Sequence, residues 1–309
     1  MINDLYQCDC PVCSSVSDAV STSLSISEDE MQRIMKEIYD GMIDEASGIS
    51  PTLYQIVRDY YHTAVEEGKK KSIVTTDDEE QPDILLENLK NSVDVFSLHR
   101  TANQCNLLIK NLIDSEGYLK DYEDWWVDCL GINGHYNEAW LRTEYDTAIL
   151  RSQMAEDWKQ YEDDADALPN LRWMRTTSVA PRDNHKAFWS IGLTLPIDDP
   201  FWSKHRPGDQ WNCKCWLEQT DEASTPRSSL PEEAKMPEVK AGLKGNPAKT
   251  GEVFSQDHPH FPSSCASCHL NTDGKIHGQT ADNMGSSKGD CNICSMMQRC
   301  KDRLEKIKI

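Results

Sequence analysis

The segment 168–217 constrains the fold of this chain more than any other part of the sequence. It reads LPNLRWMRTTSVAPRDNHKAFWSIGLTLPIDDPFWSKHRPGDQWNCKCWL and holds five of the nine tryptophans. Prolines at positions 181, 196, 200 and 207 prevent long elements, because proline lacks the N–H that helices and central strands need. Short strands are expected at 171–177 and 216–219. The segment therefore predicts a small domain with a dense aromatic core rather than a solvated linker.

Helical periodicity dominates the sequence before this segment. Ser27 and Glu30 form a capping box ahead of apolar residues spaced three and four apart. Ser50 and Pro51 open a second predicted helix, which ends near Gly68. A charged linker is expected at 69–83, and further helices are expected at 84–113 and 137–163. An aromatic turn region at 118–134 is expected between these two helices.

The chain is strongly acidic. Its formal net charge is −20, and residues 1–220 hold all of the excess, with 20 basic and 40 acidic side chains. An acidic surface repels polyanions, so contact with DNA is possible but disfavoured. No apolar run approaches the ~18 residues that cross a bilayer, and no secretory signal opens the chain. We expect a protein made in the cytoplasm, without a membrane partner.

The cysteines suggest metal binding. Ten of the twelve fall in clusters, and a reducing cytoplasm disfavours disulfides. In the tail, Cys265-x-x-Cys268 and Cys291-x-x-Cys294 have the spacing of a zinc ribbon. His269 and Cys300 are further candidate ligands there. The first pair with His269 also matches the haem c attachment motif, but that chemistry requires export, so Zn²⁺ in a structural role is the expected cofactor.

A second cysteine cluster lies near the amino terminus. Cys8, Cys10 and Cys13 supply three candidate ligands, with no fourth nearby in the sequence. Cys300 or another subunit could complete such a site. The alternative is an amino-terminal arm that binds no metal.

Residues 136–219 resemble the Mu F-like minor head proteins of tailed phages, the head-morphogenesis family. The resemblance starts on the helix that contains Tyr136-Asn137-x-x-Trp140-Leu141. It covers a little over a quarter of the chain, and the order and spacing of its motifs are more specific than any single motif. Further residues that carry it include Trp173, Thr176, Arg182, His185, Asp198, Asp199, Pro200, Phe201, Trp202, Trp211, Cys213 and Cys215.

The resemblance implies a minor structural protein of a phage or prophage head rather than an enzyme. Members of the family are present in few copies and associate with the portal or the inner capsid during assembly. The implied partners are portal and capsid proteins. The implied location is the virion head, and the host cytoplasm while the head assembles.

A further metal site is a candidate inside the region of resemblance. Cys213, Cys215 and His185 supply thiolate and imidazole ligands, both suited to zinc. A fourth ligand could come from Asp198, Asp199 or His205. In the alternative interpretation, His185 donates hydrogen bonds to the Asp198-Asp199-Pro200 turn, and the cysteines pack beside Trp211 and Trp216.

An enzyme is the second functional hypothesis. His185 with Asp198 and Asp199 could serve a metal-dependent nuclease or other hydrolase, and His258-x-His260 could be half of a nuclease site. The sequence has no nucleophile elbow, phosphate loop or HExxH motif. Paired aspartates before Pro-Phe-Trp are also typical of a turn in which Asp caps the next helix.

The expected fold class is α+β and predominantly helical, with a Cys-rich tail like a zinc ribbon. The predicted organisation has five parts. They are a polar Cys-containing arm at 1–26, a helical region at 27–135, the head-morphogenesis domain at 136–220, a linker at 221–257 and a zinc-binding tail at 258–309.

Overall fold

The computed structural model describes most of the chain between residues 26 and 263. The described ranges are 26–43, 48–74, 83–177, 185–232 and 236–263, with Leu5 and the backbone of 275–276 and 279–280. Within these ranges the protein is a mixed α/β structure, mostly helical, with one small antiparallel sheet of three strands. The expected fold class is confirmed at this level.

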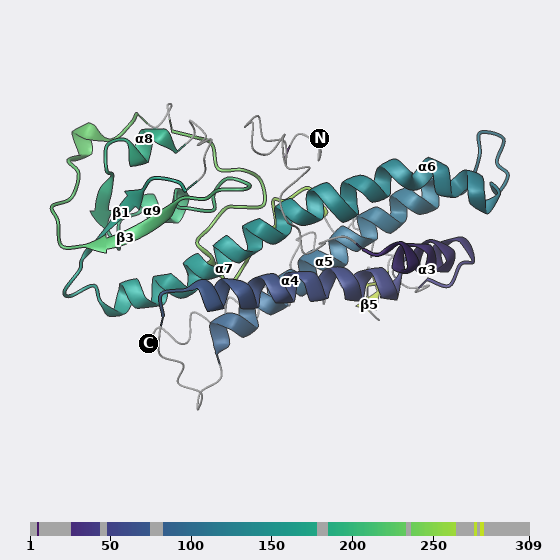
Figure 1. Cartoon of the computed structure of the whole chain (residues 1–309), viewed down its shortest axis with the longest axis horizontal. Helices are drawn as coiled ribbons and strands as arrows, with labels where there is room; N and C mark the ends of the chain where they lie inside the picture. The colour runs from purple at the N-terminus through teal and green to yellow at the C-terminus, as the bar shows by residue number, and fades with distance from the viewer. Residues whose placement is uncertain are drawn as a thin grey trace.

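Helices build an elongated bundle (Figure 1). They are α3 (Glu28–Tyr39), α4 (Pro51–Lys71), α5 (Ile84–Lys110), α6 (Tyr122–Gly134) and α7 (Leu141–Asp163), with a π-helical turn at His135–Trp140 joining α6 to α7. The predicted capping box of α3 and the Ser50 cap of α4 are both present. Helix α4 extends through Lys71, so the predicted charged linker begins later than expected.

The close approach of α4 to α7 depends on one glycine. A Cβ atom placed on Gly68 would lie 2.6 Å from the carbonyl oxygen of Ile149 and 2.6 Å from Ser152 Cβ. No real side chain tolerates such contacts. Gly68 therefore sets the distance between these two helices.

The prediction of an aromatic turn region at 118–134 was wrong for most of its length. Residues 122–134 form helix α6, and the chain turns earlier, where Ile113 and Leu119 pair in an isolated β-bridge. Trp125 is buried, and its indole N–H donates to Leu108 O at 3.0 Å. The aromatic residues thus serve as the inner face of a helix.

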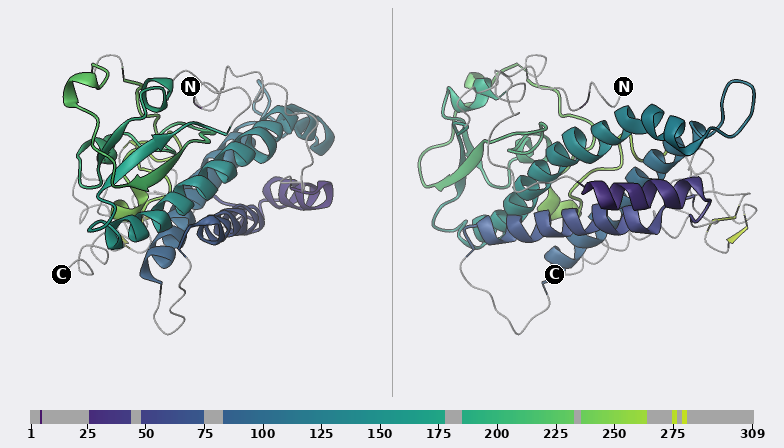
Figure 2. Two further views of the ribbon diagram at one scale, coloured as in Figure 1. Left: turned by 60° about the vertical axis from the view of Figure 1, so that its left-hand side comes forward. Right: turned by 45° about the vertical axis from the view of Figure 1, so that its right-hand side comes forward.

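The sheet has β1 (Asn170–Met174) between β2 (Thr194–Pro196) and β3 (Trp216–Thr220), and every pair is antiparallel. Leu217 lies opposite Trp173 and is buried, whereas its neighbour Trp216 is exposed. This difference follows from the alternation of side chains along a strand. Two single-turn helices, α8 (Lys186–Trp189) and α9 (Phe201–Lys204), complete this sheet unit at one end of the bundle (Figures 1 and 2).

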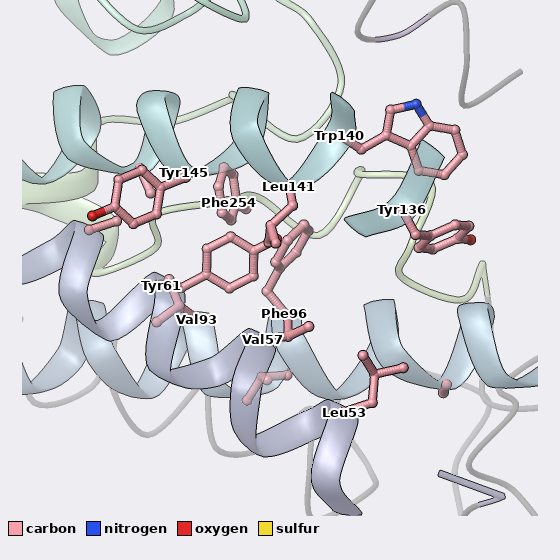
Figure 3. Close-up of a cluster of buried hydrophobic side chains, with 14 of the residues drawn as sticks. Leu53, Val57, Tyr61, Val93, Phe96, Tyr136, Trp140, Leu141, Tyr145 and Phe254 are labelled. Atoms are coloured by element: carbon pink, nitrogen blue, oxygen red, sulfur yellow. The ribbon is translucent and has the colours of Figure 1, made fainter. Parts of the chain in front are cut away.

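Two hydrophobic cores share helix α7. Its first half contributes Leu141 and Tyr145 to the bundle core, where Tyr61, Phe96 and Phe254 also meet (Figure 3). Its second half contributes to the sheet core, which is built around aromatic side chains. That core includes Trp158, Tyr161, Trp173, Phe188, Phe201, Trp202 and Cys215.

The prediction of a linker at 221–257 was wrong for its second half. Residues 236–263, called the strap below, pack against both units and contribute Leu243, Val253, Phe254 and Phe261 to the bundle core. The strap lacks regular structure apart from the single turn α10 (Pro247–Thr250). Side chains rather than a secondary-structure ladder satisfy many of its carbonyl groups. Its proline and glycine content resembles that of a linker, although its apolar residues are buried.

Three shorter elements complete the described part of the chain. They are a 3-10 turn at Arg227–Ser229 and the paired strands β4 (Lys275–Ile276) and β5 (Gln279–Thr280). None of the described helices combines the length and apolarity needed to span a membrane.

Candidate metal centre

His185, Cys213 and Cys215 converge between α8 and β3. The Nδ1 atom of His185 lies 3.5 Å from the Sγ atoms of both Cys213 and Cys215. The candidate ligand atoms of all three residues lie within 4.8 Å of one another. Two thiols and one imidazole nitrogen around a common point form a donor set suited to zinc and other thiophilic divalent metals.

The loop at 205–215, called the cysteine loop below, has a backbone that directs both thiols to this point. Asn212 has a left-handed conformation, with φ of 56°, which asparagine tolerates better than most residues. The N–H of Cys215 donates to the Sγ atom of Cys213 at 3.4 Å. The hydrogen bond between the two thiols, together with burial, raises the pKa of Cys213, so its thiolate form would need the charge of a bound cation to be stable.

Asp209 orients the imidazole. Its Oδ1 atom lies 2.6 Å from Nε2 of His185, and its Oδ2 atom lies 3.4 Å from Nδ1 of His205. Asp209 is fully buried. Since the carboxylate accepts a hydrogen bond from the N–H at Nε2, a neutral His185 presents the lone pair of Nδ1 to the two thiols. Metal-binding histidines are commonly held in this way, with a carboxylate on the ring nitrogen remote from the metal.

The electrostatics of the group favour a positive charge between Asp209 and the thiols. Burial opposes protonation of His185, but Asp209 and Cys213 outweigh it and raise the pKa of His185 to about 10. Burial likewise opposes ionisation of Asp209, but the charge of His185 and its hydrogen bond lower the pKa of Asp209. The hydrogen bond with Cys213 lowers the pKa of Cys215. Without metal, the extra proton on His185 supplies this positive charge; a bound divalent cation would supply it instead.

The sequence-based candidates for a fourth ligand have other roles. Asp199 accepts a hydrogen bond from the N–H of Phe201 at 2.9 Å and pairs with Arg227, so it stabilises the turn that leads into α9. Asp198 is exposed, and His205 faces Asp209. Among the described residues, the group therefore holds three ligands. Arg182 lies outside the described residues.

The alternative interpretation of His185 was wrong in its partners. The hydrogen-bond partner of His185 is Asp209, and not the Asp198-Asp199 turn. Cys215 belongs to the sheet core, whereas Trp211 belongs to the bundle core. The observed contacts of His185 and Asp199 therefore do not join His185 to the two aspartates, as the hydrolase hypothesis requires.

A second group of possible ligands lies in the bundle core. Glu144, His258 and His260 are all buried, with ligand atoms within 4.8 Å. His258 Nδ1 accepts the N–H of His260 at 3.1 Å, and Asn103 approaches Nδ1 of His260 at 3.4 Å. Both Nδ1 atoms thus act as hydrogen-bond acceptors. In each neutral ring the proton is therefore on Nε2, so the Nε2 atom has no free lone pair with which to bind a metal.

Hydrogen bonds and ion pairs explain this second group without a metal. The Oε2 atom of Glu144 accepts from Arg100 Nε at 2.7 Å and from the Tyr61 hydroxyl at 2.5 Å, and its Oε1 atom lies 3.3 Å from His260 Nε2. Burial lowers the pKa of both His258 and His260, so both are neutral near pH 7. His258 and His260 therefore act in packing, and the prediction of half a nuclease site finds no support in their surroundings.

Cys215, His185 and Asp209 also match the residue types of a thiol nucleophile with its base and orienting acid. Two features favour a metal instead. Cys215 is 4% exposed, and a nucleophile must reach its substrate. A second thiol, Cys213, lies at the same distance from His185 Nδ1, which a nucleophilic mechanism does not require.

The remaining predicted ligands, in the tail and the amino-terminal arm, lie outside the described residues. They are Cys265, Cys268, Cys291, Cys294, His269, Cys300, Cys8, Cys10 and Cys13. The two isolated cysteines, Cys105 and Cys129, are buried in the bundle core, as expected for small apolar residues.

Sequence reasoning missed Asp209 and its contact with His205. Asp209 lies in Arg-Pro-Gly-Asp-Gln, which looks like an ordinary polar turn. A possible signal was its position four residues before Cys213, in the loop that delivers the ligands.

In comparisons with known proteins, no family model, no curated protein and no solved structure matches the chain.

Proposed function

We propose that this chain is a minor head protein of a tailed phage or prophage, which acts by binding portal or capsid subunits during head assembly. The observation that carries the proposal is the ordered set of motifs between Tyr136 and Gln219. Among these motif residues, the ring of Trp173 contacts the rings of both His185 and Trp202. This packing supports a structural role for the motifs, because residues kept for a reaction would need access to a substrate.

The end of the bundle farthest from the sheet unit offers a binding surface. Exposed apolar residues gather around the α5–α6 connection and along α6, although the described surface nearby is acidic. They are Ile113, Tyr118, Leu119, Val127 and Leu130, each at least 48% exposed. Clusters of exposed apolar residues rimmed by polar ones are typical of protein–protein interfaces. We assign contact with the head subunits to this surface.

The test is incorporation into particles. The chain would be co-expressed with the portal, scaffolding and major capsid proteins of the phage or prophage that carries its gene, and purified procapsids would be analysed by quantitative mass spectrometry. We expect a few copies of the wild-type chain per particle. The double variant Val127→Asp/Leu130→Asp should be excluded. The control Ile73→Asp, also at an exposed apolar position but just beyond the end of α4 and outside this surface, should be retained. A wild-type chain absent from procapsids and virions would refute the proposal.

We also propose Zn²⁺ as a structural cofactor. The ligand set of His185, Cys213 and Cys215 supports this, as does the spacing of the tail pairs at 265–268 and 291–294. Bound zinc would hold these chain segments together and would take part in no reaction. Elemental analysis of protein purified without added metal should find zinc. Metal-free protein that fails to bind added zinc would overturn this part of the proposal.

A further inference from the structure

The cysteine loop lies between the two hydrophobic cores and contributes to both. Trp211 enters the bundle core, where its ring stacks on Phe254 with centroids 5.6 Å apart. Two and four residues later, Cys213 and Cys215 face His185 at the sheet core. Between them, the N–H of Asn212 donates to Thr147 Oγ1 on α7 at 3.3 Å. The conformation of this loop therefore determines whether Trp211 is seated in the bundle.

The same loop holds the strap. The N–H of Lys240 donates to the carbonyl oxygen of Asp209 at 3.1 Å, and Gln210 Nε2 donates to Glu238 O at 2.6 Å. Arg206 donates to Leu243 O at 2.8 Å. Three successive parts of the strap thus depend on the loop, and the strap in turn delivers Phe254 against Trp211.

We propose that a zinc ion bound by His185, Cys213 and Cys215 locks the cysteine loop, and that zinc binding is thermodynamically coupled to the docking of Trp211 and the strap on the bundle. The proposal rests on the zinc proposed above. His185 precedes α8, whereas both cysteines lie at the end of the loop, 28 and 30 residues after His185. A shared ion would therefore cross-link two segments that are distant in the sequence. Because the loop has no regular structure, such a cross-link removes conformational freedom that packing alone must otherwise restrain.

Coupling of this kind is reciprocal, which makes it testable from either side. If zinc favours the docked loop, then loss of the docked tryptophan must weaken zinc binding by the same factor, although Trp211 is not a ligand. Factors of about 5 to 150 are usual for coupled sites, so we expect roughly a tenfold effect.

The first experiment measures zinc affinity of the full chain by competition with a chromophoric chelator. The zinc ion of interest is the one that binds to the wild type but not to the variant Cys213→Ser/Cys215→Ser. Comparison with this variant distinguishes the centre at His185 from zinc bound by the tail cysteines. Trp211→Ala should weaken binding of that ion about tenfold. Trp126→Ala, the same substitution at a half-buried tryptophan of the bundle core outside the loop, should leave it unchanged. Equal affinity in wild type and Trp211→Ala would overturn the coupling.

The second experiment follows hydrogen exchange of strap amides at 240–255 when zinc is added to metal-free protein. We expect exchange to slow about tenfold in the wild type and not in Cys213→Ser/Cys215→Ser. Unchanged exchange in a wild type that binds the ion would overturn the coupling while leaving the zinc proposal intact. Failure of the wild type to bind the ion would overturn both. The hydrogen-exchange test needs no Trp211 variant, so it decides the matter even if Trp211→Ala does not fold.

Discussion

Arg151 and Arg206 donate hydrogen bonds to the same carbonyl oxygen, that of Leu243, at 3.0 and 2.8 Å. Arg151 lies on α7 and Arg206 lies in the cysteine loop, and both side chains are 1% exposed. Arg151 also donates to Val253 O at 2.5 Å and to Gly208 O at 3.0 Å. The two guanidinium groups thus satisfy carbonyl groups of a strap that has almost no regular structure of its own.

Replacement of Arg151 by methionine should therefore destabilise the protein strongly. The apolar chain would fill similar space but leave the carbonyl groups of Gly208 and Val253 without this donor, whereas Leu243 O keeps its hydrogen bond from Arg206. Each buried unsatisfied group costs ~1–3 kcal/mol, so we expect a loss of at least about 2 kcal/mol in the free energy of unfolding. Urea denaturation measures it. The control Arg142→Met, at a partly exposed residue on the same helix, should change stability by less than about 1 kcal/mol.

The substitution Gly68→Ala should destabilise the bundle, although alanine has a higher helix propensity than glycine. The helix preference favours alanine by ~1 kcal/mol, but overpacking against Ile149 O and Ser152 costs ~1–3 kcal/mol or more. We expect a net loss of stability in thermal unfolding. Gly131→Ala on α6, where an added Cβ meets nothing within 4 Å, should instead be neutral or stabilising. Equal effects of the two substitutions would contradict the assigned role of Gly68.

The substitution Asp209→Asn should weaken metal binding without abolishing it. The ligands at His185, Cys213 and Cys215 would remain, but the charged acceptor that orients the imidazole would be lost. Changes to such supporting residues lower metal affinity by ~10–100-fold. Chelator competition checks this value. Asp198→Asn, at an exposed aspartate with no contact to the ligands among the described residues, should bind zinc like the wild type.

Acidification should destabilise the protein through His258. Burial, and secondarily the neighbouring His260, holds the pKa of His258 well below its usual value of about 6.5. Below pH 6.5 the unfolded chain therefore takes up a proton that the folded protein does not. The contribution of His258 to stability is present above about pH 6.5 and lost as the pH falls, by ~1.4 kcal/mol per pH unit.

The measurement compares urea unfolding at pH 7.5 and 5.5, with chelator present throughout so that metal release does not contribute. His258→Phe keeps a ring between Phe96 and Trp211 and should reduce the pH dependence. His135→Phe, at an exposed position, serves as the control. An unchanged pH dependence in His258→Phe would show that other groups cause it.

The helices were predictable because their signals are local. The Ser27–Glu30 capping box and the Ser50-Pro51 start each act within one turn, and both appear at the expected residues. Strand β2 has only three residues, too short for an alternating pattern to show. Helix α6 was missed because its glycines and tryptophans resemble a turn, and only burial of Trp125 and Cys129 reveals its inner face.

The sequence by itself determined the chemistry available to this protein: its acidic charge, its clustered thiols, its helical amino-terminal half and its aromatic segment at 168–217. Only the tertiary structure decided which of those groups meet. It paired His185 with Asp209 rather than with the Asp198-Asp199 turn, and it buried a segment that resembles a linker. The physical reason is that residue types and spacings record local preferences. Burial and hydrogen-bond pairing between distant segments instead depend on which backbone groups remain unsatisfied after the helices and strands have formed.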